Sequence, residues 1–168
     1  MEFLKASEAD AGRIMEIIGQ SQAYLKQQGV NQWQNNYPNI GTVLNDIHNE
    51  ECCVLLDNGR IVGTVTVIFG GEKTYSKIYD GEWLSSNEYA TIHRIAVDPG
   101  YKGRGLAAEI IEKIEAMCRT KGIGSIRVDT HRQNESMKRM LHKNGFTYCG
   151  IIYVADNSER VAFEKLLP

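Results

Sequence analysis

Segments with strand-like and helix-like patterns alternate along the second half of the chain, and this alternation limits the folds that the chain can adopt. Apolar or alternating runs typical of strands cover residues 90–97, 125–131, 146–154 and 160–166. Apolar residues at helical spacing cover residues 104–121, and a second helix is capped by Asn134 and closed by Gly145.

The first half of the chain adds two helices and a hairpin. Helical spacing predicts a helix from about Glu8 to about Gln28 and a shorter one over residues 42–49. Strand-like runs at residues 52–56 and 60–69 flank Asn58-Gly59. An Asn-Gly pair between apolar runs indicates a tight hairpin, because both central residues must accept a positive φ.

Together these elements follow the order β-α-α-β-β-β-α-β-α-β-β, which predicts an α/β sandwich with a mixed sheet and helices on both faces. The length of 168 residues is that of one domain, so we expect a single domain over residues 1–168. The 42% hydrophobic and 24% charged residues are ordinary for a globular protein. No disulfide or metal is needed to stabilise a core of this size.

The charge balance and the cysteines restrict the partners. With 19 basic and 21 acidic residues the net charge is −2, which argues against a nucleic-acid-binding protein. The longest mostly apolar stretch, residues 61–69, is too short to cross a bilayer, and the first residues lack a secretory pattern. The four cysteines have no Cys-x-x-Cys spacing, so free thiols are the simpler interpretation. We expect a cytoplasmic monomer or homodimer that binds neither membrane nor nucleic acid.

One turn carries the strongest functional signal. The strand Ile95-Ala96-Val97 leads into a basic, glycine-rich turn, and an amphipathic helix follows at once. Free N–H groups at a helix N-terminus favour an anion, and Gly103 and Gly105 allow close approach of a phosphate. The pattern predicts a pyrophosphate cradle; the alternative is a tight connection with solvated charges. The spacing fits neither a P-loop nor a dinucleotide-binding fingerprint.

At this point the sequence resembles the GNAT superfamily of acetyl-CoA-dependent N-acyltransferases. Its turn resembles the family's Arg/Gln-x-x-Gly-x-Gly/Ala loop, and residues 95–97 resemble the family's fourth strand. Asn134 with Asn144-Gly145-Phe146 resembles the second conserved block. The element order agrees from Met1 to Leu167, so the resemblance covers the chain and implies a mostly antiparallel sheet splayed between its fourth and fifth strands.

The resemblance implies a binding site for acetyl-CoA as co-substrate. Backbone groups of Ile95, Ala96 and Val97 are expected to pair with the pantetheine arm. Asn134 either bonds that arm or only caps its helix. The CoA pyrophosphate is expected on the amides of the turn, which are those of Lys102, Gly103, Arg104, Gly105, Leu106 and Ala107.

Two positions depart from the family pattern. Lys102 stands where an Arg or Gln is usual, and Leu141 stands where many members have a tyrosine as general acid. Tyr148 is a weak substitute for that acid, and a packed strand aromatic is the alternative. Beside N-acetyltransfer to a primary amine, the missing tyrosine therefore leaves open a CoA-binding sensor or interaction module of the same fold.

The resemblance implies direct attack of an amine on the thioester. At pH 7 deprotonating a lysine-like amine costs about 4.6 kcal/mol, and an α-amine only about 1.4 kcal/mol. His93, two residues before Ile95, is the candidate base, since strand alternation places both on one side. A packed histidine is the alternative. Asp129 and His131 share a strand face, but two ligands do not make a metal site, so no metal is expected.

The acceptor side is expected to involve aromatic residues of two loops. Trp33 and Tyr37 lie in the loop between the first two helices, and Trp83 lies in the long loop over residues 70–88. In the family these loops flank the acceptor. Ordinary loop packing is the alternative, and the identity of the amine is left open.

Overall fold

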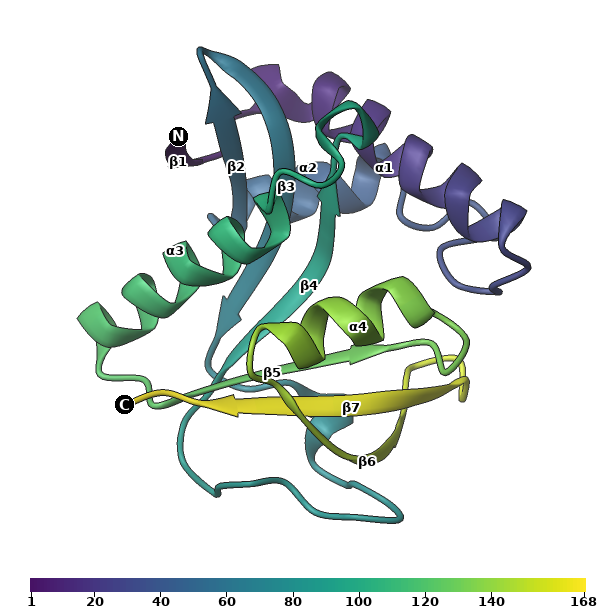
Figure 1. The fold of residues 1–168 in the computed structure, drawn as a ribbon, viewed down its shortest axis with the longest axis vertical. Helices are drawn as coiled ribbons and strands as arrows, with labels where there is room; N and C mark the ends of the chain where they lie inside the picture. Colours follow the sequence, from purple (N-terminus) through teal and green to yellow (C-terminus); the bar gives the residue numbers. More distant parts are fainter. The chain divides into compact units, whose positions relative to one another are not determined.

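The structure, a computed structural model, describes residues 1–168, and its elements follow the predicted order (Figure 1). The strands and helices are β1 (Glu2–Lys5), α1 (Ala11–Gln27), α2 (Ile40–His48), β2 (Cys52–Asp57), β3 (Arg60–Phe69), β4 (Ala90–Val97), α3 (Leu106–Lys121), β5 (Ser125–Thr130), α4 (Glu135–Lys143), β6 (Thr147–Tyr153) and β7 (Glu159–Leu166). None of these helices combines the length and the apolarity that a membrane span requires.

The strands form one mixed sheet in the order β1-β2-β3-β4-β5-β7-β6. The pairs β1–β2, β2–β3, β5–β7 and β6–β7 are antiparallel. β4 and β5 are parallel, and their ladder holds only the pairs Ala90↔Ile126 and Thr91↔Arg127. The sheet is therefore splayed between its fourth and fifth strands, which confirms the predicted fold class.

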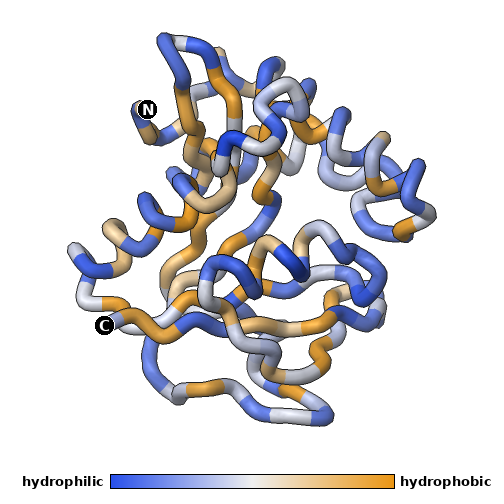
Figure 2. Tube along the Cα trace, in the orientation of Figure 1, coloured by the Kyte–Doolittle hydropathy of each residue, from blue (hydrophilic) through white to orange (hydrophobic).

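The chain divides into two compact units. The first unit comprises Met1–Val67 and His93–Lys113. Its core joins α1 and α2 to the β2–β3 hairpin through Ile14, Ile17 and Val43. In Figure 2 the hairpin strands are largely orange, as expected for strands most of whose residues are buried.

The second unit comprises Ile68–Ile92 and Ile114–Pro168. The loop over residues 70–89 is packed against its strands: Tyr75 is buried and donates to Asp129 Oδ2 at 2.6 Å. Tyr79 and Ile151 exchange two backbone hydrogen bonds of 2.8 Å, so the loop adds a bridge to β6. This segment is long and polar in sequence, but it is structured through its aromatic residues.

Local signals explain where the elements begin and end. Asn58 and Gly59 have φ values of 49° and 79°, and Asp57 pairs with Arg60, so the predicted hairpin is confirmed. α3 begins at Leu106, two residues later than expected, because Gly105 at φ 73° lies outside the right-handed helical region.

The four cysteines are free and buried. Burial raises the pKa of the Cys52, Cys118 and Cys149 thiols to about 11, so these side chains stay protonated at neutral pH. Since the thiolate is the reactive form, these three thiols are poor nucleophiles.

Candidate functional site

The glycine-rich turn after β4 is exposed, and the space beside its two glycines is empty of protein atoms. Gly103 and Gly105 have φ values of 80° and 73°, which side chains rarely adopt. A Cβ atom built on either glycine would meet no protein atom within 4 Å. The turn therefore combines a backbone that favours glycine with space that a side chain would fill.

Two of the six amides in the turn already donate within it. Lys102 N–H donates to Pro99 O and Arg104 N–H to Tyr101 O, both at 3.2 Å. The first bond at the start of α3 runs from Glu109 N–H to Gly105 O at 3.0 Å, so the preceding amides have no partner in the helix. The expected set of donors narrows to Gly103, Gly105, Leu106 and Ala107, which fits an anion at a helix N-terminus.

Asp98 fixes the start of this turn. Its Oδ1 accepts from Gly100 N–H at 2.8 Å, and Oδ2 accepts from Arg13 and lies 3.6 Å from the Arg60 guanidinium. The Gly100 bond and then the Arg13 bond lower the pKa of the Asp98 carboxyl. The turn thus starts from a buried carboxylate that two cations face.

β4 is irregular just before the segment expected to pair with the pantetheine arm. Arg94 has φ 49°, a left-handed conformation within a strand. Such a residue interrupts the strand's alternation of side chains. The spacing of two positions between His93 and Ile95 therefore does not by itself place them on one side of β4. His93 is half-buried and engaged in the structure, and its role as a base stays a prediction. Of the segment over residues 95–97, which was expected to pair with the pantetheine arm, Ala96 packs in the core of the first unit.

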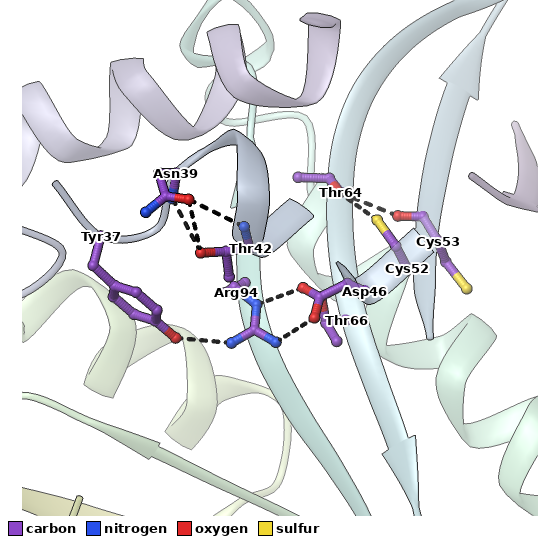
Figure 3. Close-up of polar contacts among 9 residues, drawn as sticks. All are labelled: Tyr37, Asn39, Thr42, Asp46, Cys52, Cys53, Thr64, Thr66 and Arg94. Atoms are coloured by element: carbon purple, nitrogen blue, oxygen red, sulfur yellow. Dashed lines mark hydrogen bonds and ion pairs between the residues drawn. The ribbon is translucent and has the colours of Figure 1, made fainter. Parts of the chain in front are cut away.

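The two aromatic residues of the α1–α2 loop differ in environment. Trp33 is partly buried against the core of the first unit, as the packing alternative expects. The Tyr37 side chain is exposed, and its hydroxyl accepts from Arg94 Nη1 at 2.9 Å (Figure 3). Tyr37 is therefore connected to β4 beside His93 within one compact unit.

Three further predicted site residues, Trp83, Asn134 and Tyr148, lie in the second unit. Asn134 caps α4, since its Oδ1 accepts from Met137 N–H at 3.2 Å, which confirms the capping role. Tyr148 is 52% exposed, and its ring meets Phe163 edge-on at a centroid distance of 5.9 Å. Whether Asn134 also bonds a ligand, or Tyr148 donates a proton, stays a prediction.

Trp83 is used in packing. Its Nε1–H donates to Tyr75 O at 3.0 Å, and its ring lies 4.2 Å from the Arg127 guanidinium carbon. Tyr89 approaches the same guanidinium at 4.0 Å, and Arg127 is paired with the buried Glu164. These contacts match the packing alternative, and the structure does not test the role of Trp83 toward an acceptor.

Comparison with known proteins decides the family. The model of the acetyltransferase (GNAT) family matches residues 20–146. The chain belongs to the GNAT acetyltransferase family. A GNAT-family acetyltransferase from Streptococcus agalactiae 2603 is 32% identical, with a TM-score of 0.91 over 99% of this chain and 95% of that one. A comparison with curated protein sequences gave no match.

Two more distant structures share the GNAT fold and hold the coenzyme. PaiA N-acetyltransferase from Thermoplasma acidophilum, in complex with coenzyme A, is 18% identical, with a TM-score of 0.74 over 98% of each chain. YncA from Salmonella typhimurium, with its cofactor acetyl-CoA, is 17% identical, with a TM-score of 0.67 over 99% of this chain and 94% of that one. These likenesses concern the fold.

Sequence reasoning missed the side chains that hold the GNAT turn and β4 in place. Asp98 is held by Arg13, 85 residues away, and Arg94 by Asp46, 48 residues away. Neither pair has a local sequence signal, because helical spacing and strand alternation report only near neighbours. In the sequence, Asp98 is a single acidic residue after a strand, which is typical of an ordinary turn.

Proposed function

We propose that residues 1–168 form one N-acetyltransferase domain that transfers the acetyl group of acetyl-CoA to a primary amine in a ternary complex. Membership of the GNAT family and the coenzymes in the PaiA and YncA structures support the donor. The observation that carries the proposal is the open glycine turn. Gly103 and Gly105 have positive φ values, and no protein atom lies within 4 Å of a Cβ atom built on either.

The turn binds the diphosphate of acetyl-CoA in this proposal. Gly103, Gly105, Leu106 and Ala107 supply N–H donors, and the N-terminus of α3 adds its partial positive charge. The pantetheine arm runs beside residues 95–97, beyond the point where the ladder to β5 ends at Thr91. That course places the thioester near the strand segment that carries His93.

The reaction is nucleophilic attack by the neutral amine. Its nitrogen forms a bond to the acetyl carbonyl carbon, the carbon–sulfur bond breaks, and CoA leaves as the thiolate. The amine's surplus proton passes to His93, directly or through water. Because a thiol with pKa near 8.5 is a fair leaving group, protonation by Tyr148 is helpful rather than required.

A CoA-binding module without turnover is the second candidate. Leu141, at the position of the family's usual tyrosine, is fully buried in the second unit and carries no proton to donate. This absence of a proton donor is the observation that favours the second candidate.

We propose a cytoplasmic monomer or homodimer with no nucleic-acid or membrane partner. The net charge of −2 supports the absence of a nucleic-acid partner, and the free, buried cysteines suit a reducing cytoplasm, where CoA is present.

The deciding experiment measures free thiol released from acetyl-CoA across a panel of small amines, amino acids and peptides. The enzyme proposal predicts thiol release that depends on one class of amine and a product whose mass increases by one acetyl group. Coenzyme A binding measured in parallel separates the two candidates. Binding without turnover on any acceptor would favour the module, and absence of both would overturn the two together.

A further inference from the structure

Arg94 makes three hydrogen bonds that connect β4, α2 and the α1–α2 loop (Figure 3). Its Nε donates to Asp46 Oδ2 at 2.6 Å, and its Nη2 donates to Asp46 Oδ1 at 2.8 Å. Its Nη1 donates to the Tyr37 hydroxyl oxygen at 2.9 Å. The planar guanidinium is thereby held at both ends, with the carboxylate on one side and the phenol on the other.

Asp46 anchors this arrangement from α2. The residue is 3% exposed, and its Oδ2 also accepts from Thr66 Oγ1 at 2.8 Å. A buried carboxylate without a partner is costly, and a two-point pair with arginine fixes direction as well as distance. One end of the Arg94 guanidinium is therefore fixed in direction by a carboxylate that solvent does not reach.

The backbone of Arg94 adds a second restraint. Its φ of 49° lies in the left-handed region, which a residue with a side chain adopts only at a cost in free energy, so the surrounding contacts must hold it there. The strained residue lies between His93 and the segment over residues 95–97. A single side chain therefore fixes the irregular point of β4 and reaches Tyr37.

The Tyr37 side chain has few other restraints. It is 46% exposed, whereas the backbone beside it is tied by Gln22 Nε2 to Pro38 O at 3.0 Å and by Asn39 capping α2. Because the phenol oxygen accepts from Arg94, its own proton remains available for a polar group of another molecule. Arg94 thus orients an exposed donor.

We propose that Arg94 is a positioning residue for the acceptor: anchored by Asp46, it holds the Tyr37 hydroxyl where the amine substrate binds and does not touch acetyl-CoA. This inference rests on the proposed N-acetyltransferase function. Arg94 and Asp46 belong to the acceptor half of the proposed site. The donor half, the turn over residues 102–107, is held by a different pair, Asp98 and Arg13.

A double-mutant cycle tests the positioning role. Arg94→Lys keeps a charge for Asp46 but loses the planar fork, and Tyr37→Phe removes only the hydroxyl. Each single variant is expected to raise the acceptor KM about tenfold and to leave the acetyl-CoA KM within about twofold. The double variant is expected to lose no more than either single variant. Losses that multiply, to about a hundredfold, or a change confined to the acetyl-CoA KM would overturn the proposal.

Thr66→Val is the matched control. It removes another hydrogen bond from the same Asp46 carboxylate but does not contact Tyr37. A purely structural role for the cluster would make this variant resemble Arg94→Lys in its kinetics. The positioning role predicts a lower melting temperature and an unchanged acceptor KM for Thr66→Val. An acceptor KM raised as far as in Arg94→Lys would contradict it.

Amide hydrogen exchange gives a readout that does not need activity. In Arg94→Lys and Tyr37→Phe, exchange of the Asn39 amide, whose N–H donates to Thr42 Oγ1 at 3.3 Å, is expected to accelerate about tenfold, and in Thr66→Val it is expected to stay as in the unsubstituted protein. If the unsubstituted protein acetylates no amine, the proposed function fails, and exchange still tests whether Arg94 holds Tyr37. Unchanged exchange in Tyr37→Phe would overturn that link even if Arg94→Lys does not fold.

Discussion

At the scale of single residues, two buried carboxylates determine how the candidate site is held. Asp98 and Asp46 are 5% and 3% exposed, and each faces an arginine within the first compact unit. Replacing a buried ion pair with apolar residues is often neutral for stability, so such pairs are weak sources of folding free energy. Their main effect here is geometric, because they fix the turn and Arg94 in defined positions.

Thr91 has a buried hydroxyl, which is expected to lower the free energy of unfolding. It is fully buried at the last pair of the β4–β5 ladder, and its Oγ1 has no hydrogen-bond partner. Thr91→Val should raise the free energy of unfolding by about 1 kcal/mol, because an unsatisfied buried hydroxyl is replaced by a methyl group. Urea unfolding measures this change. Thr66→Val is the matched control and should be destabilised, since that hydroxyl donates to Asp46.

His93→Gln should discriminate between classes of amine. At pH 7 the rate should fall about a hundredfold or more for lysine-like amines, which need a base, and by much less for α-amines. The measurement is kcat/KM for a lysine side-chain analogue and for an amino-acid amide at the same pH. Equal losses for the two amines would remove His93 from proton transfer.

At the scale of elements, the turn between β4 and α3 depends on Asp98. Its folded-state pKa is lowered, so its stabilising contribution is present above the unfolded value of about 3.9 and is lost as the pH falls through the lowered value. Asp98→Asn should destabilise the protein by about 1–3 kcal/mol at pH 7 and raise the acetyl-CoA KM. The difference from the unsubstituted protein should shrink below about pH 4.

Urea unfolding between pH 2 and pH 7 checks this prediction. Glu16→Gln is the control, because Glu16 also pairs with Arg13 but has an exposed side chain. Exposed pairs contribute little, so this variant should change stability by less than about 1 kcal/mol at any pH. A constant difference for Asp98→Asn down to pH 2 would contradict the assignment of the lowered pKa.

The elements that the sequence predicts are those with local signals. Asn58-Gly59 determines the hairpin, and apolar spacing determines the helices, because each depends on residues that are neighbours along the chain. The irregular point of β4 at Arg94 has no such signal, since it depends on a carboxylate 48 residues away. The predicted shared face of His93 and Ile95 therefore assumed a regular strand.

At the scale of the whole molecule, the fold and the family follow from the order of elements and one turn motif. The splayed sheet and the GNAT family were both predicted and are confirmed. The acceptor is not predictable in the same way, because in the proposed function side chains on loops recognise it, and Trp83 of the long loop is engaged in packing around Arg127. The proposed donor half uses backbone groups of the turn over residues 102–107, and the glycines that such a turn needs are visible in the sequence.

The proposed function depends on binding of the coenzyme A diphosphate by the turn over residues 102–107, and calorimetric titration measures this binding. Gly105→Val places a branched side chain at φ 73° and in the open space of the turn. Gly122→Val is the matched control, since Gly122, just after α3, also has a positive φ and open space. We predict that coenzyme A affinity falls at least about tenfold in Gly105→Val and stays within about twofold in Gly122→Val. No binding heat with the unsubstituted protein, or equal affinity in Gly105→Val, would contradict diphosphate binding by this turn.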